Sequence, residues 1–203
     1  MDLLGQLAQS LSGSTMDNMA ARLGTDRSTT QTAIAAALPA ILGQLNRNTN
    51  DPQGARSLAD ALERDHDGGL LDNLGGLLGG QLMGKQADGA GILGHIFGGQ
   101  LRSAEQGVSQ ASGLDTAKVA QLMAMLAPIV MSALAKKKST DGLDSGSLSN
   151  VLGREADQAR RAAPDGLLGH LSGFIDRDGD GSIADDLAQQ AGGALLGSLF
   201  GRR

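Results

Sequence analysis

Apolar residues recur at helical spacing along the first part of the chain. The clearest stripe follows the positions i, i+3, i+4, i+7, i+8 and i+11, which lie on one face of an α-helix. No stretch alternates apolar and polar residues for long enough to predict a strand. The stripes that predict successive helices are Leu3, Leu4, Leu7 and Leu11, then Met16, Met19, Ala20 and Leu23, then Ile34, Ala37, Leu38, Ile41, Leu42 and Leu45, and finally Leu58 and Leu62.

Three residues between and within these stripes predict where helices end and begin. Gly24 suits the position after a helix, because glycine adopts positive φ freely. Asp26 suits the N-cap of the long helix, since its carboxylate accepts hydrogen bonds from the unpaired N–H groups of the first turn. Pro39 lies inside the long stripe, and its missing N–H predicts a kink or a break there.

The same pattern recurs when the sequence is shifted so that Asp26 falls on Asp115. The long apolar stripe then falls on a second one with no gap, and the later helix matches if one residue is inserted. This recurrence predicts an all-α protein of two related multi-helix halves, an internal duplication joined by Gly-rich connectors. The matched positions include Gly113, Pro128, Met123, Leu126, Ala127, Val130, Met131, Leu134, Leu148 and Leu152.

Composition shifts divide the chain into four expected segments. A stretch rich in Gly and Leu separates the halves, and a charged stretch that ends at Pro164 marks a boundary after the second. The expected segments are a first helical repeat at 1–67, a connector at 68–91, a second helical repeat at 92–157, and a C-terminal segment at 158–203 that carries an acidic loop and a Leu/Gly tail.

Composition excludes several classes of function. The chain has no Cys, which removes disulfides, thiolate metal sites and Cys nucleophiles. Its formal net charge is −5 and aromatic residues are 1%, whereas proteins that bind nucleic acids are usually basic or offer aromatic stacking platforms. No Ser/His/Asp arrangement has a nucleophile elbow, and His66, His95 and His170 are isolated. We therefore expect a protein that is not an enzyme and does not bind nucleic acid.

The N-terminus and the apolar runs bear on localisation. No basic residue precedes Arg22, so we do not expect a secretory signal in this N-terminal stretch. The longest uncharged runs each contain a proline and do not resemble the roughly 20 apolar residues of a membrane span. We expect a cytoplasmic protein. Small residues recur four apart, as at Gly75 and Gly79. Two interpretations stay open: a flexible connector, or a close-packing or membrane-touching surface.

The strongest chemical signal is an acidic loop at residues 176–186. Alternating carboxylates followed by Gly181 are typical of a calcium loop, in which the oxygens converge on the cation and the glycine permits a sharp turn. Leu187 stands where such loops usually place a bidentate Glu. Asp and Gly also dominate ordinary solvated turns, which is the alternative. The expected calcium ligands are Asp176, Asp178, Asp180, Ser182, Asp185 and Asp186.

A second acidic loop at residues 63–73 aligns with the first residue for residue. Its Arg64 and Gly68 are identical to the corresponding residues of the first loop, as are three of its acids. It is the weaker of the two candidate calcium loops, and the solvated turn is again the alternative. Its expected ligands are Glu63, Asp65, Asp67 and Asp72.

Two weaker patterns leave further alternatives open. Residues 20–31 look superficially like a helix-turn-helix, in which Ser28, Thr29 and Gln31 would face bases, although the acidic charge disfavours DNA binding. The run 136–138 of three lysines follows the second long stripe. We expect it to complement the dipole of that helix, with a contact to a phosphate or an acidic partner as the alternative.

Several runs of this sequence stand out together: residues 23–29 and 38–42 in the first half, residues 92–98, 113–115 and 126–128 in the second, and residues 65–68 between them. These runs resemble a bacterial family, the domain of unknown function 937, which is related to the YidB-like proteins, and residues 65–68 resemble a signature of that family. The resemblance extends to about Asp186. It implies a helical, cytoplasmic bacterial protein and supplies no catalytic residues.

Together these patterns favour a non-enzymatic interaction or assembly module whose acidic loops bind calcium structurally. Its modest, aliphatic faces favour burial against a second copy, so we expect a homo-oligomer; the sequence names no other protein partner. The alternatives are a calcium-responsive regulator and, behind it, a peripheral membrane or DNA-binding protein.

Overall fold

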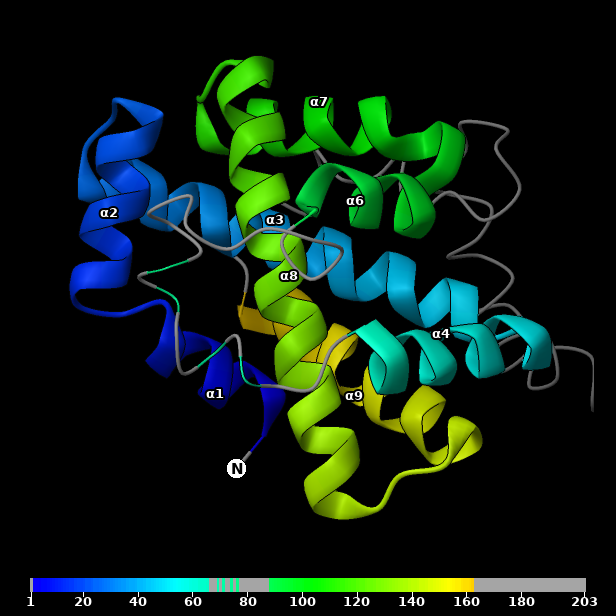
Figure 1. The fold of residues 1–203 in the computed structure, drawn as a ribbon. Coiled ribbons are helices and arrows are strands. Elements are labelled where there is room, and N and C mark those ends of the chain that lie inside the picture. Colours follow the sequence, from blue (N-terminus) through cyan, green and yellow to red (C-terminus); the bar gives the residue numbers. More distant parts are fainter. Residues whose placement is uncertain are drawn as a thin grey trace, which may run out of the picture.

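The computed structural model describes residues 2–65 and 88–162, together with residues 69, 71, 74 and 76. All regular secondary structure assigned within these residues is helical, so the prediction of an all-α protein is confirmed. The elements, drawn in Figure 1, are α1 (Leu3–Ser10), α2 (Ser14–Leu23), α3 (Arg27–Thr49), α4 (Pro52–Asp65), α6 (Gly89–Phe97), the short 3₁₀ helix η2 (Gly98–Gln100), α7 (Leu101–Ser112), α8 (Thr116–Asp141) and α9 (Ser145–Ala162).

The two longest helices, α3 and α8, cross at the centre of the molecule (Figure 1). Both are buried on nearly every side along their middle turns, which is the environment that a helix apolar all round requires. By length and composition α8 could also cross a membrane, with a mean hydropathy of 1.6 over its most apolar window. In this structure 72% of that window is buried inside the protein, as expected for a core helix.

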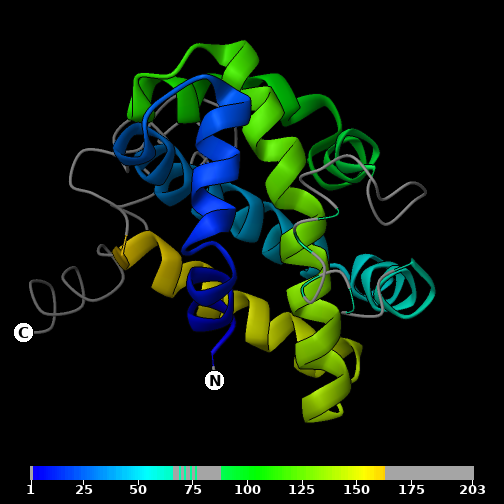
Figure 2. The same ribbon diagram turned by 60° about the vertical axis from the view of Figure 1, so that its left-hand side comes forward.

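Helices from both halves of the chain pack together (Figure 2), and their buried side chains form one apolar core. The first long helix, α3, packs against α7 and α9, and the second, α8, packs against α1 and α4. The core is aliphatic: leucine, isoleucine, valine, alanine and methionine side chains fill it, with Phe97 as its one aromatic residue among the described positions. The halves therefore pack against each other and share their interior.

The helix boundaries follow the capping residues. Gly24 and Gly113 both adopt the left-handed conformation, with φ of 59° and 74°. Asp26 accepts a hydrogen bond from the N–H of Thr29 at 2.9 Å, and Asp115 accepts one from Lys118 at the same distance. These predicted caps are confirmed, and the helices that follow them start where expected.

Of the kink or break predicted at the prolines, the break is wrong. Helix α3 continues through Pro39 and α8 through Pro128, since both prolines are buried among the apolar residues of their helices. Each proline still removes one ladder hydrogen bond. In α8 the carbonyl left without its helical donor is that of Ala124, four residues earlier, and α6 begins directly against this carbonyl.

Two helices cross the expected segment boundaries. Helix α9 runs without interruption to Ala162, past the boundary expected after residue 157, because Ala156 and Ala159 lie on its buried face. Helix α6 begins at Gly89, inside the stretch expected to be connector.

Candidate functional site

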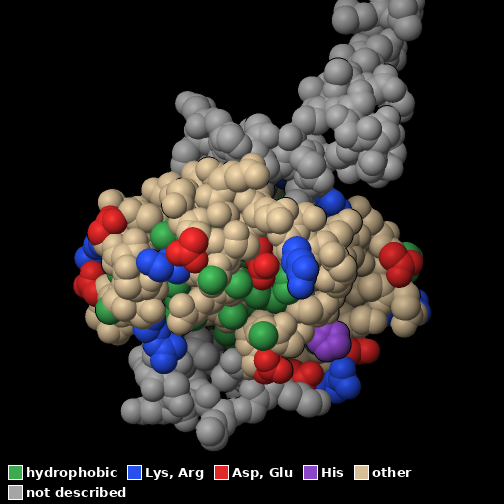
Figure 3. All heavy atoms as spheres, turned by 90° about the horizontal axis from the view of Figure 1, so that it is seen from above, with side chains coloured by type: hydrophobic (Ala, Val, Ile, Leu, Met, Phe, Trp, Pro, Cys, Tyr) green, Lys and Arg blue, Asp and Glu red, His purple; other side chains and the backbone are tan. Residues whose placement is uncertain are grey.

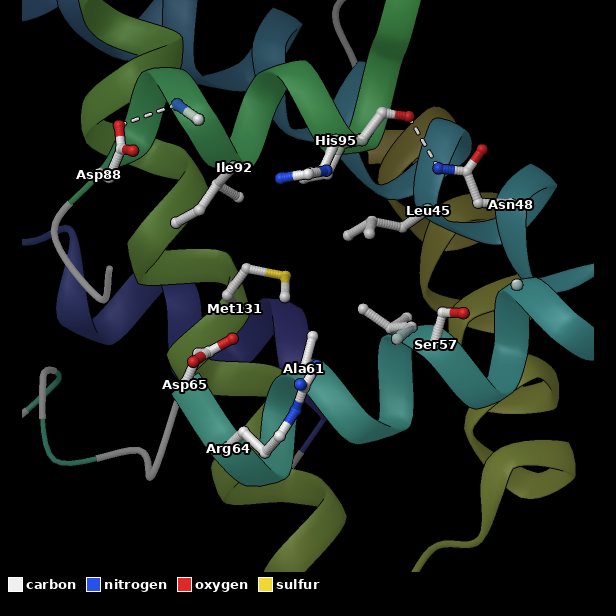
Figure 4. Close-up of a pocket in the computed structure, with 14 residues that line it drawn as sticks. Leu45, Asn48, Ser57, Ala61, Arg64, Asp65, Asp88, Ile92, His95 and Met131 are labelled. Atoms are coloured by element: carbon white, nitrogen blue, oxygen red, sulfur yellow. Dashed lines mark hydrogen bonds between the residues drawn. The ribbon is translucent and has the colours of Figure 1, made fainter. Parts of the chain in front are cut away.

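A pocket of about 750 Å³ opens between α4 and α6 (Figure 4). Its floor comes from α3 and α8, which cross beneath it. The apolar lining is aliphatic, and Met131 lies at the centre of the view in Figure 4. The apolar lining residues are Leu45, Leu58, Ala61, Ile92, Ile96 and Met131.

Close backbone contacts hold the two walls of this pocket. A Cβ atom at Gly89 would lie 1.7 Å from the carbonyl oxygen of Ala124, so only glycine lets the start of α6 rest on α8. On the other wall, a Cβ atom at Gly54 would lie 1.9 Å from the carbonyl oxygen of Asn48. Glycine at these two positions therefore sets where α6 and α4 lie on the long helices.

Side-chain hydrogen bonds fix the ends of α6. Asp88 caps the first turn, where its Oδ1 accepts a hydrogen bond from the N–H of Gly91 at 2.9 Å. At the other end, Nδ2 of Asn48 donates to the carbonyl of Ile96 at 2.7 Å, which ties α6 to α3. Figure 4 draws both bonds at the rim of the pocket.

The polar rim contains a carboxylate without a partner. Asp65, at the last turn of α4, has no hydrogen bond or ion pair with the described residues, and Figure 4 shows its oxygens on the side of Met131. The neighbouring Arg64 donates through Nε to the carbonyl of Asp60 on its own helix, at 3.3 Å. His95 is exposed, and its ring points into the pocket from α6. Along the sequence His95 stands apart from other polar residues, so its position at the pocket was not predicted.

The expected calcium ligands fall largely outside the described residues. Asp176, Asp178, Asp180, Ser182, Asp185 and Asp186 all lie there, as do Asp67 and Asp72 of the second loop. Of the expected ligands in that second loop, only Glu63 and Asp65 are described. Within the described part of the chain no three His, Cys, Asp or Glu side chains come together as metal ligands.

The two described acids of the second loop lie in different environments. Glu63 forms an ion pair with Lys138 of α8, and this hydrogen bond and the lysine charge lower the pKa of Glu63. Asp65 instead lines the pocket. The lysine run thus contributes a contact between α4 and α8 that the sequence did not predict.

A buried carboxylate joins the two ends of the described chain. Glu155 on α9 is 5% exposed and accepts hydrogen bonds from the N–H groups of Leu3 at 2.9 Å and Leu4 at 3.1 Å. It thereby satisfies two of the unpaired donors at the start of α1. Glu155 was not predicted as a contact residue, although it lies at helical spacing from Leu148 and Leu152 and so is an acid on an apolar stripe.

The residues of the helix-turn-helix pattern serve as a cap. The hydroxyl groups of Ser28 and Thr29 both donate to the Asp26 carboxylate, and Arg27 pairs with Asp17 at 3.0 Å. The two hydroxyl bonds, together with the bond from the N–H of Thr29, lower the pKa of Asp26.

On the face drawn in Figure 3, basic and acidic side chains are interspersed rather than gathered by sign.

A family model described as bacterial protein of unknown function (DUF937) matches residues 5–137, which span nearly all of the helices from α1 through α8. No curated protein and no solved structure matches the chain.

Proposed function

This chain belongs to the DUF937 family of bacterial proteins of unknown function, and we propose that it acts as a non-enzymatic interaction module that binds its partner in the pocket between α4 and α6. The observation that carries this proposal is the pocket itself. Binding sites are typically hollows of about 300–1,000 Å³ with an apolar lining and a few converging polar groups. The α4–α6 pocket has that size and that construction.

The exposure of the lining supports a binding role. Leu58 and Ile92 are only half-buried although they pack against the core, so both walls keep apolar surface in contact with solvent. Covering such surface is favourable by about 25 cal/mol per Å². The caps and close contacts described above hold the walls in place, and a rigid site loses less entropy on binding.

We also propose that the two halves are copies of one unit. Helices α1 to α4 and α6 to α9 follow the same order, with a left-handed glycine before each long helix and a proline inside each. The shared aliphatic core and the open pocket are compatible with assembly from more than one copy. Calcium at the acidic loops and a cytoplasmic location stay proposals from the sequence.

Amide NMR with a small aliphatic alcohol tests the binding role. We expect 2-methyl-1-propanol to shift the amides of Ala61, Ile92 and Met131 in a saturable manner. The Ala61→Arg variant places a long cationic side chain at the wall and should abolish the shifts without unfolding the protein. Shifts scattered over the surface, or unchanged in this variant, would contradict the proposal.

A further inference from the structure

We infer that the α4–α6 pocket receives the first turns of a short leucine-rich helix from a partner, with Asp65 as the acceptor for its N-terminal N–H groups. This inference rests on the proposed function, because it names the chemistry of the group that the pocket binds. It draws on a comparison between α4 and α9 within this molecule.

The molecule already contains one such docked helix. Helix α1 has eight residues, and it packs on α8 and α9 with Leu3 and Leu7 fully buried. Its first N–H groups point at the buried carboxylate of Glu155 on α9. This fold therefore already contains a short leucine-rich helix whose N-terminal N–H groups are bound by a carboxylate from another helix.

The residues of α4 and α9 correspond at several positions toward the end of α4. The register that aligns Leu58 with Leu148 also aligns Leu62 with Leu152, Arg64 with Arg154, and Asp65 with Glu155. Asp65 thus stands on α4 where the carboxylate that holds α1 stands on α9.

The two corresponding surfaces differ in whether they are covered. Leu148 is fully buried, whereas its counterpart Leu58 is half-buried. Glu155 accepts two N–H groups, whereas Asp65 accepts none from the described residues. On α9, the end of this surface at Glu155 is covered by the start of α1; on α4, the described residues leave the corresponding end at Asp65 lining the pocket.

The position of α6 explains why it leaves this surface open. The contact between Gly89 and the carbonyl of Ala124 holds the start of α6 on α8. Its N-terminal N–H of Gly91 is taken by Asp88, so α6 does not use Asp65 as a cap. The space between α6 and α4 is the pocket.

Charge favours a helix N-terminus as the occupant. The first turn of a helix carries roughly half a positive charge together with its unpaired N–H donors. Asp65 and Asp88 lie on the same side of the pocket in Figure 4 and present negative charge to it. Arg64 donates to a carbonyl of its own helix through Nε, and His95 faces the pocket from α6.

The test uses an acetylated peptide of residues 1–12, the sequence of α1 and its cap, added to the full-length chain. We expect saturable binding by amide NMR with shifts at Ala61, Asp65 and Ile92. Asp65→Ala should weaken binding at least about fivefold. Asp65→Asn, which keeps the shape of the side chain, should weaken it less. Asp60→Ala, an exposed acid on the same helix, is the matched control and should leave binding unchanged.

Three outcomes would overturn the inference. They are no binding at about 1 mM peptide, equal binding to the Asp65→Ala chain with an unchanged melting temperature, and shifts around Glu155 in place of the pocket. A control peptide with Leu3→Ser and Leu7→Ser should not bind. If the alcohol occupies the pocket and the peptide does not, the proposed function stands without this inference; if neither binds there, both fail.

Discussion

At the scale of single residues, Glu155 is the clearest case of a side chain whose role depends on long-range packing. It lies on α9, yet its two bonds go to the start of α1. Replacing it with alanine leaves two N–H groups without an acceptor in a buried place. An unsatisfied buried donor costs about 1–3 kcal/mol.

We therefore predict that Glu155→Ala lowers the free energy of unfolding by about 2–3 kcal/mol. Glu155→Gln keeps one acceptor oxygen and should lose less. Urea unfolding of the two variants beside the parent chain measures both values. Equal stabilities for all three proteins would show that the carboxylate does not hold α1.

A second prediction concerns the glycine that seats α6. Gly89→Ala forces a Cβ atom against the Ala124 carbonyl, and the resulting shift of α6 should cost about 1–3 kcal/mol. Gly94→Ala on the same helix is the control, because no atom lies within 4 Å of its added Cβ. This control should gain about 0.5–1 kcal/mol, since glycine is unfavourable inside a helix. Thermal unfolding that ranks Gly89→Ala above Gly94→Ala would contradict the contact.

At the scale of elements, three exposed acids make the free energy of unfolding depend on pH. Two of them lie at the starts of helices, and the third forms an ion pair between two helices. Hydrogen bonds from Ser28 and Thr29 lower the pKa of Asp26, and those from Ser147 lower the pKa of Asp144. Lys138 lowers the pKa of Glu63. A carboxyl whose pKa is lower in the folded state stabilises the fold above its unfolded pKa, about 4, and this contribution is lost as pH falls below that value.

The third prediction follows from that sign. The free energy of unfolding should fall steadily below about pH 4 in the parent chain. Asp26→Asn keeps a good N-cap and cannot titrate, so its acid slope should be shallower and its stability should approach that of the parent as the pH falls toward the acid end of the range. Urea midpoints measured from pH 2 to pH 7 give both slopes. Parallel slopes would exclude Asp26 as a contributor.

Local patterns were enough to predict the elements, because each signal acts within a few residues. The left-handed Gly24, the cap at Asp26 and the apolar stripe of α3 follow from helix geometry alone. The continuation of α3 through Pro39 could not be predicted from local patterns, because the burial of this proline depends on contacts with other helices. The pocket could not be predicted from the sequence for the same reason. Its walls depend on close contacts of Gly54 and Gly89, and each contact joins residues of different helices.

At the scale of the whole molecule, the acidic loop at residues 176–186 adds an expected cation site beyond the described helices. We predict that calcium added to the demetallated full chain releases or absorbs measurable heat at millimolar concentration or below. The double variant Asp178→Ala with Asp180→Ala should abolish this heat, because it removes two converging ligands. Heat that is unchanged in the double variant would assign the binding elsewhere, and no heat in the parent chain would remove the site.

The arrangement of the whole molecule is also what creates the pocket. One aliphatic core joins both halves, with α1 closed against α9 and α6 held away from α4. We propose above all that this opening is a binding surface held by the fold. Its shape depends on the crossing of α3 and α8 and on the two glycine contacts.

A crystal structure of the full-length chain soaked in 2-methyl-1-propanol tests that proposal most directly. We predict an open pocket between α4 and α6, with an ordered alcohol between Leu58 and Ile92. A structure in which α4 and α6 meet, with their own side chains filling the space, would contradict it.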